Sequence, residues 1–232
     1  MTGDDNHDQD TSSDLNTATD APGSASTVNG LDVTACKRCQ GLVESRSQIV
    51  NGVGPADAEL VFIGEAPGAN EDEYGEPFVG RSGDVLDDAL NEAGVSRDSI
   101  RITNCVRCRP PENRNPTTEE LSNCRRYLEH ELSALNPAVI VTLGKVPSEH
   151  LLDRQIAVTT AAGDVTDIRL GDQSYRVIIS VHPAATLYDQ SQSTTFIDTI
   201  KSAASLAGVQ SDIDNPTDTT SGGQSRLGEY ED

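Results

Sequence analysis

The sequence predicts an α/β domain built on a largely parallel β-sheet. Apolar runs of five or six residues, typical of strands buried on both faces, alternate along the chain with amphipathic helical stretches. The two ends of the 232-residue chain lack this alternation and are rich in Asp, Ser, Thr, Gly and Asn. A chain of this length fits one ordinary domain with two terminal segments.

Local signals support each element in order. Ser82 is suited to cap a helix that Gly94 ends, and the run Thr117-Thr118-Glu119-Glu120 forms a capping box. In chain order the predicted elements are a strand over 59–63, a helix over 82–93, a strand over 100–105, a long helix from 117 that ends before Pro137, a strand over 138–143, a helix over 145–152, a hairpin of 165–170 and 174–181 around Gly171-Asp172, and a helix over 193–207.

The terminal segments are predicted to be disordered, with one folded domain over 33–208 between them. Residues 1–32 hold seven Asp and no Lys or Arg, and residues 209–232 hold six acids with Arg226 as their single base. Such segments cannot bury enough apolar surface to offset chain entropy. The start has no basic or apolar run typical of a signal peptide, and no apolar run is long enough to span a membrane. We therefore expect a cytoplasmic protein with no membrane partner.

The charge balance indicates a protein adapted to molar salt. The formal net charge is -21, and only three of the 17 basic residues are Lys. This composition is similar to that of haloarchaeal cytoplasmic proteins, although an acidic mesophilic protein with acidic tails remains an alternative. At 1 M salt, charges are screened within about 3 Å. The negative charge therefore does not exclude a nucleic-acid partner, and a local basic patch is the better indicator.

Polar side chains follow three of the predicted strands at the point where each strand ends. Gly64 and Glu65 follow the first strand, Asn104 lies at the end of the second, and His182 follows the second strand of the hairpin. Ligands of open α/β sheets bind beyond the carboxyl ends of the strands. We therefore expect a carboxylate, an amide and an imidazole to converge at one edge. The alternative is that each residue only caps a turn.

A rigid aromatic residue lies in the loop between the first strand and the first helix. Phe78 follows a proline that stiffens the loop. An aromatic ring beside the Asn104 amide suits a flat heterocycle, because the ring offers a stacking face and the amide can both donate and accept. The alternative is that Phe78 belongs to the core. The acidic residues over 71–76 match no calcium-loop pattern and predict a solvated loop.

Five cysteines admit two sets of four metal ligands. Cys36, Cys39, Cys105 and Cys108 have the paired C-x-x-C spacing of a zinc site. The second set, Cys36, Cys39, Cys108 and Cys124, suits an iron–sulfur cluster. Spacing favours zinc, whereas the position of Cys105 inside a predicted strand favours the second set.

Arginines surround these cysteines and predict a positive surface for phosphate groups. A network of surface ion pairs is the alternative. The arginines are Arg107, Arg109, Arg114, Arg125 and Arg126.

Four motifs, taken in order, resemble those of the family 4 uracil-DNA glycosylases, the iron–sulfur branch of the uracil-DNA glycosylase superfamily. They are GEAPG at 64–68, GEPFVGRSG at 75–83, TNCVRCRPP at 103–111 and HPAA at 182–185. The resemblance covers roughly residues 34–207. It implies a three-layer αβα sandwich, for which we expect a four-stranded sheet.

The resemblance also implies a cofactor and a set of site residues. It assigns a [4Fe-4S] cluster to Cys36, Cys39, Cys108 and Cys124, and leaves Cys105 as a spare thiol in the core. In this family, Phe78 would stack on a flipped uracil, Asn104 would read its Watson–Crick edge and His182 would donate to uracil O2. The backbone at Gly64 and Glu65 would line the pocket, and Glu65 would position the attacking water.

The implied activity is hydrolysis of the N-glycosidic bond of deoxyuridine in DNA, which releases uracil and leaves an abasic site. Family-1 enzymes place an Asp at the position of Ala66, and alanine cannot act as a base. We expect Phe78 and Tyr74 to exclude thymine, and Leu187 to press into the minor groove.

Three other functions remain open: a broader glycosylase that also takes hypoxanthine or xanthine, a non-catalytic DNA-binding or polymerase-associated module, and a zinc-ribbon binding protein. The partner is expected to be uracil-containing DNA. We take the protein to be a monomer, and a replication-clamp partner stays open.

Overall fold

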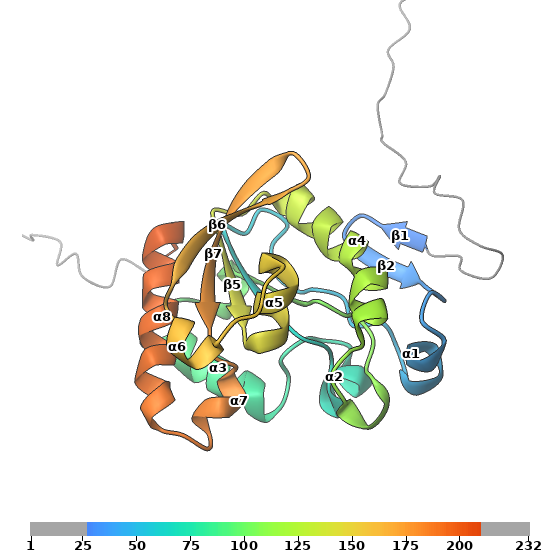
Figure 1. The fold of residues 1–232 in the computed structure, drawn as a ribbon, viewed down its shortest axis with the longest axis horizontal. Helices are drawn as coiled ribbons and strands as arrows, with labels where there is room; N and C mark the ends of the chain where they lie inside the picture. Colours follow the sequence, from blue (N-terminus) through green and yellow to red (C-terminus); the bar gives the residue numbers. More distant parts are fainter. Residues whose placement is uncertain (1–26, 210–232) are drawn as a thin grey trace, which may run out of the picture.

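The computed structural model describes residues 27–209 (Figure 1). Most of the two segments predicted to be disordered, residues 1–26 and 210–232, therefore lies outside the described residues. Within the described range, no helix combines the length and the apolar character that crossing a membrane requires.

A five-stranded sheet forms the centre of the domain, in the strand order β4-β3-β5-β7-β6. Four of the strands run parallel: β3 (Leu60–Gly64), β4 (Arg101–Asn104), β5 (Val139–Leu143) and β7 (Gln173–Ser180). The edge strand β6 (Val165–Leu170) is antiparallel to β7. The predicted largely parallel sheet is confirmed.

The expected count of four strands is wrong, because β6 joins the sheet as its fifth strand. Leu170 pairs with Gln173, so only Gly171 and Asp172 connect β6 to β7. Gly171 has a φ of 57°, in the left-handed region that tight hairpin turns require. The short turn brings β6 back along β7, where it pairs the hydrogen-bonding groups at that edge.

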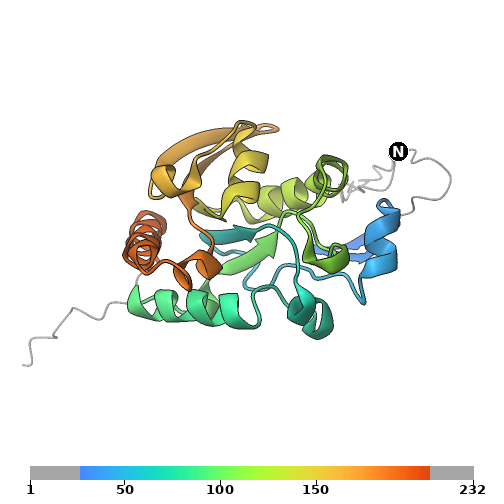
Figure 2. The same cartoon turned by 60° about the horizontal axis from the view of Figure 1, so that its bottom comes forward.

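Helices cover both faces of the sheet, which confirms the three-layer αβα arrangement (Figure 2). On one face lie α3 (Arg81–Glu92) and α8 (Ser191–Ala207), whose apolar residues pack in one core with Leu60 and Phe62 of β3. On the other face lie α4 (Thr118–Leu135) and α5 (Lys145–Leu152), which pack with Val61 and Ile63. The alternation along β3 follows from the two-residue period of a strand.

Several short elements were not predicted, because they are too short to show a hydrophobic period. The hairpin of β1 and β2 begins inside the segment expected to be disordered, so the boundary expected at residue 33 falls within it. The elements are β1 (Thr27–Asn29), β2 (Asp32–Ala35), α1 (Gln40–Ser45), α2 (Ala69–Tyr74), α6 (Val158–Ala161), α7 (Pro183–Thr186) and two 3₁₀ turns at Arg97–Ser99 and Pro111–Asn113.

A buried ionic network joins the sheet, α4 and the β1–β2 hairpin. The Glu131 carboxylate is fully buried and accepts from Arg101 Nε at 2.8 Å, Thr103 Oγ1 at 2.9 Å and Arg107 Nη2 at 2.7 Å. Arg107 also donates to the carbonyl of Leu31 at 2.9 Å. Buried charges require such partners, and the network places the loop after β4 against the rest of the domain.

Candidate functional site

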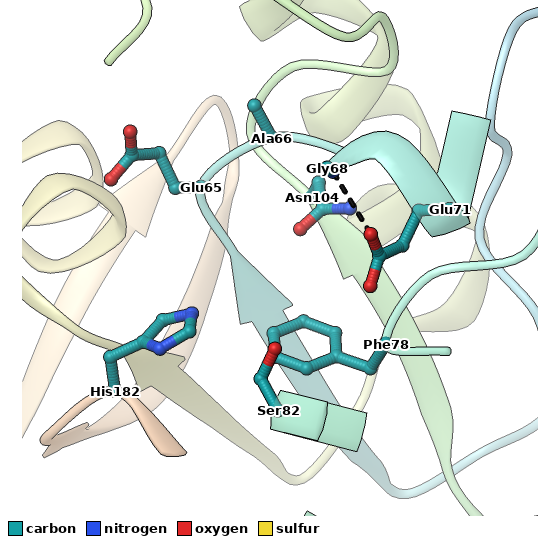
Figure 3. A pocket seen from close by; sticks show the side chains of 8 residues that line it. All are labelled: Glu65, Ala66, Gly68, Glu71, Phe78, Ser82, Asn104 and His182. Atoms are coloured by element: carbon teal, nitrogen blue, oxygen red, sulfur yellow. Dashed lines mark hydrogen bonds between the residues drawn. The ribbon is translucent and has the colours of Figure 1, made fainter. Parts of the chain in front are cut away.

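A cavity of about 190 Å³ opens at the carboxyl edge of the sheet. It is smaller than the roughly 300–1,000 Å³ typical of pockets for drug-sized ligands, so it suits a small ligand. Figure 3 shows its lining residues, which come from the ends of β3, β4 and β7, from the loop before α3, and from the helices α2 and α3. They are Glu65, Ala66, Gly68, Glu71, Phe78, Ser82, Asn104 and His182. The predicted convergence of Glu65, Phe78, Asn104 and His182 is thus present.

Phe78 forms one wall of the cavity at the margin of the apolar core. Its φ is 55°, which is rare for a bulky residue and costs on the order of 1–3 kcal/mol. Arg97 Nη2 holds the loop by donating to the carbonyls of Pro77 at 2.9 Å and Phe78 at 3.1 Å. The ring centroid lies 5.9 Å from that of His182. The strained backbone therefore aims a fixed ring at the cavity.

Gly64 lets Phe78 and Asn104 approach the end of β3. A Cβ at Gly64 would overlap Asn104 Oδ1 and would lie 2.6 Å from Phe78 Cε2. Gly64 pairs with Asn104 between β3 and β4, so the two strands bring them together. The Asn104 side chain is 4% exposed, and among the described residues no protein group hydrogen-bonds its amide. Its donors and acceptor are available to a ligand.

His182 is held as a neutral imidazole by its position at the start of α7. Its Nδ1 accepts from the backbone N–H of Ala184 at 3.1 Å, which leaves the ring proton on Nε2. Burial lowers the pKa of His182 to about 4. Gly144 allows this close packing, because a Cβ there would lie 3.1 Å from His182 Cβ. The ring reaches into the cavity (Figure 3) and can donate through Nε2.

Two carboxylates line the cavity. Burial raises the pKa of Glu65, whose carboxylate lies across the cavity from Phe78 in Figure 3. Glu71 Oε2 accepts from the backbone N–H of Gly68 at 3.1 Å, the capping contact of α2. The prediction of a solvated acidic loop is therefore wrong for Glu71 and for Asp72, which is buried on the same helix. Tyr74, expected to help exclude thymine, is 70% exposed and does not line the cavity.

Glu71 and Ser82 are the lining residues that the sequence did not point to. A signal for Glu71 was present, since a Glu three residues after Gly68 is the pattern of a helix start. Ser82 was expected to cap a helix, but α3 begins at Arg81 with Gly80 as its N-cap. Ser82 therefore turns its side chain to the cavity instead.

Four cysteines line a second, smaller pocket between α1, α4 and the loop after β4. They are Cys36, Cys39, Cys108 and Cys124. Cys105 lies apart from them, buried in the apolar core beneath α4, and burial raises its pKa. The zinc set that includes Cys105 is thus not brought together. As they stand, no three His, Cys, Asp or Glu side chains within 27–209 form a group that could hold a metal ion.

Side-chain donors face three of these four sulfurs, and such donors would stabilise the sulfurs once they are deprotonated. The pairs are Arg46 Nη1 with Cys108 Sγ at 2.8 Å, Asn123 Nδ2 with Cys39 Sγ at 3.5 Å, and Tyr127 Oη with Cys36 Sγ at 3.5 Å. The donor set fits a group bound through thiolates.

The five arginines near the cysteines all contact other side chains, and the expected phosphate surface stays a prediction. Three of the five pair with glutamates, so the ion-pair alternative describes them. Their partners are Glu131 for Arg107, Glu120 for Arg114, Glu129 for Arg125, the Asn113 amide for Arg109 and the Tyr127 ring for Arg126.

The fold and the cavity define an α/β protein with a small cavity, lined by an aromatic ring, an amide and an imidazole, at the carboxyl edge of its sheet. The model of the Uracil DNA glycosylase superfamily matches residues 51–204. The chain therefore belongs to the uracil-DNA glycosylase superfamily, as its motifs predicted.

Its curated relatives include several proteins named type-4 uracil-DNA glycosylase. The relative from Archaeoglobus fulgidus is 40% identical over 161 residues, covering 68% of this chain and 80% of the relative. The one from Thermotoga maritima is 39% identical over 68% of this chain and 81% of the relative. The relative from Sulfurisphaera tokodaii is 37% identical, and the match covers 68% of this chain and 74% of the relative.

Proposed function

We propose that the protein is a base-excision repair glycosylase that hydrolyses the N-glycosidic bond of deoxyuridine in DNA. The observation that carries this function is the convergence of Phe78, Asn104 and His182 on one small cavity. The type-4 names of the relatives support the choice of uracil. The products would be free uracil and an abasic site.

Binding would begin with extrusion of the uracil from the helix, at a cost of a few kcal/mol. The base would then stack on Phe78, whose ring is already fixed by its backbone. The Asn104 amide would pair with the edge of the base. A buried amide without a partner costs about 1–3 kcal/mol, so a ligand that completes its hydrogen bonds is favoured.

Cleavage would break the bond between C1′ and N1 and leave its electron pair on uracil. The neutral His182 would donate from Nε2 to the oxygen that gains this charge, and one such donor is worth about 3 kcal/mol. Water would then attack C1′ and release a proton to solvent. Ala66 lines the cavity and offers no base, so we assign Glu65 the positioning of the water.

We propose that Glu71, rather than Tyr74, forms the wall that rejects thymine. Its carboxylate is held against the Gly68 N–H and faces the same cavity as Phe78. A methyl group placed against a carboxylate removes water from the charge without replacing its hydrogen bonds. A base with a 5-methyl group would therefore bind poorly.

We further propose that Cys36, Cys39, Cys108 and Cys124 hold a [4Fe-4S] cluster. The support is the shared pocket, the separate position of Cys105 and the donors that face three of the sulfurs. When bound, the cluster would cross-link the N-terminal segment, the loop after β4 and α4. Hydrolysis moves no electron between redox centres, so the site would be structural.

The deciding experiment incubates the full chain, in molar potassium chloride, with a duplex oligonucleotide that carries one uracil. We expect an abasic site and free uracil. Parallel duplexes with hypoxanthine or xanthine test the broader range, and binding without base release would indicate a non-catalytic module.

Analysis of iron, acid-labile sulfide and zinc in the same preparation tests the cluster. Sedimentation and activity across salt concentrations test the proposed monomer and the adaptation to high salt.

A further inference from the structure

Arg46 connects two of the segments that carry the cysteines. It follows directly on α1, and its guanidinium donates in two directions. Nη1 donates to Cys108 Sγ at 2.8 Å, and Nη2 donates to the carbonyl of Cys36 at 2.7 Å. Cys36 lies before α1, whereas Cys108 lies in the loop after β4. One planar side chain thus bridges segments 72 residues apart in sequence, with the fixed fork geometry that arginine provides.

The choice of partners distinguishes Arg46 from three other arginines of this region. Arg107, Arg114 and Arg125 each bind a glutamate. Among the described residues, the partners of the Arg46 guanidinium are a sulfur and a carbonyl and not a carboxylate, although the chain holds 38 acidic residues. A guanidinium is always protonated, and a thiol sulfur is only a weak acceptor. A short contact from this cation therefore suits a sulfur that carries negative charge.

We propose that Arg46 is a positioning residue for the cluster site, which holds the Cys108 thiolate and offsets part of the negative charge of the loaded pocket. The inference rests on the proposed cluster. Two consequences follow from the geometry. A cation near the cluster favours its more negative, reduced state and so raises the reduction potential. The bridge to Cys36 also holds two ligand segments together and so slows metal loss.

The variants Arg46→Gln and Arg46→Lys separate these two effects. Glutamine removes the charge and the bridge, while lysine keeps the charge but has no planar fork to span both acceptors. Arg169→Gln is the matched control, since it removes the same charge from a side chain that is 72% exposed on the β6–β7 hairpin. The readouts are iron and sulfide content, the reduction potential by voltammetry, and the rate of iron loss to a chelator.

We expect Arg46→Gln to lower the reduction potential and to lose iron about 10-fold faster than the unaltered protein. Arg46→Lys should restore the potential but still lose iron faster, and Arg169→Gln should match the unaltered protein in both. An unchanged potential and an unchanged rate in Arg46→Gln would overturn the role of Arg46 while leaving the cluster in place.

Two further results are decisive. If Arg46→Gln is recovered without iron, the Arg46→Lys variant provides the test of the bridge. Iron loss from Arg46→Lys at the rate of the unaltered protein would refute the bridge. An unaltered protein that contains neither iron nor sulfide would refute the cluster itself and, with it, this role. Uracil release by the same preparation is measured separately. The absence of a cluster can therefore be distinguished from the absence of glycosylase activity.

Discussion

Both oxygens of the Asp72 carboxylate accept a hydrogen bond from the backbone N–H of Ser47, whose nitrogen lies 2.9 Å from Oδ1 and 2.8 Å from Oδ2. Asp72 is buried and follows Glu71 on α2, the helix at the cavity wall. Ser47 follows Arg46, whose guanidinium contacts the cysteine pocket. Gln48 adds a hydrogen bond from its amide to the Asp72 carbonyl at 2.9 Å. The wall of the base cavity and the margin of the cysteine pocket are therefore joined through this contact.

Replacing Asp72 by Asn should weaken both sites. One acceptor oxygen becomes a donor that faces an N–H, so we expect the free energy of unfolding to fall by about 1–3 kcal/mol. Uracil release should fall as well, because α2 carries Glu71. Urea denaturation and single-turnover release measure the two effects. Asp88→Asn is the control on an exposed position of α3, and equal behaviour of the two variants would contradict the coupling.

Replacing Gly64 by Ala should lower activity without unfolding the protein. The added methyl would overlap Asn104 Oδ1 and press on the Phe78 ring, so both must leave their places in the cavity. We expect uracil release to fall by at least about 10-fold, since catalytic geometry tolerates little displacement. Gly41→Ala provides the control, because a Cβ there meets no atom within 4 Å. Full activity in Gly64→Ala would show that the close approach is unnecessary.

The stability of the protein should report the buried neutral imidazole of His182. Its pKa is lowered from 6.5 to about 4 by burial, so the unfolded chain takes up a proton first as the pH falls. The contribution of His182 to stability is therefore present above pH 6.5 and is lost progressively toward pH 4. Between pH 6.5 and pH 4, urea titrations should show that the free energy of unfolding falls more steeply with decreasing pH in the unaltered protein than in His182→Gln. Parallel curves for the two proteins would refute the neutral state.

Selectivity against thymine should depend on Glu71 and not on Tyr74. Glu71→Ala opens the wall beside Phe78, whereas Tyr74→Ala alters a side chain that is 70% exposed. One methyl group in a pocket is worth about 10–200-fold in discrimination. We expect the ratio of uracil to thymine release to fall by about 10-fold in Glu71→Ala only. A loss confined to Tyr74→Ala would restore the role that the sequence predicted for it.

Breaking the buried network should cost far more stability than breaking a surface pair. Glu131→Gln leaves Arg101 and Arg107 buried without a countercharge, so unfolding should become easier by about 3–5 kcal/mol. Glu129→Gln removes only the partly exposed pair with Arg125, which is worth below about 1 kcal/mol. Urea denaturation in one buffer compares the two variants. Equal losses would mean that the network does not hold the domain together.

Long elements and their order were accessible from sequence, because period and capping are local properties. The capping box of Thr117 and Glu120 is present at the start of α4, which ends before Pro137. The short helix α2 was not predicted, because six residues carry too little hydrophobic pattern. Glu71 was missed together with α2, and Ser82 was missed because α3 begins at Arg81 with Gly80, not Ser82, as its N-cap.

The choice between the two cysteine sets shows where spacing alone stops. Cys105 and Cys108 have the spacing of a zinc pair, but Cys105, which directly follows β4, is buried in the core. Cys124 enters the pocket instead, because α4 runs back beside the loop after β4. Spacing along the chain does not record the direction in which a side chain points.

By itself, the sequence determined the α/β class, the family and the identity of the side chains at the carboxyl ends of the strands, because these follow from periodicity and from motifs that are contiguous in the chain. The tertiary structure alone decided which cysteines share a pocket, that Glu71 and not Tyr74 faces the base cavity, and that most arginines near the thiols neutralise buried or neighbouring glutamates. These outcomes depend on burial and on contacts between segments far apart in sequence, where the low dielectric of the interior sets the cost of every unpaired charge.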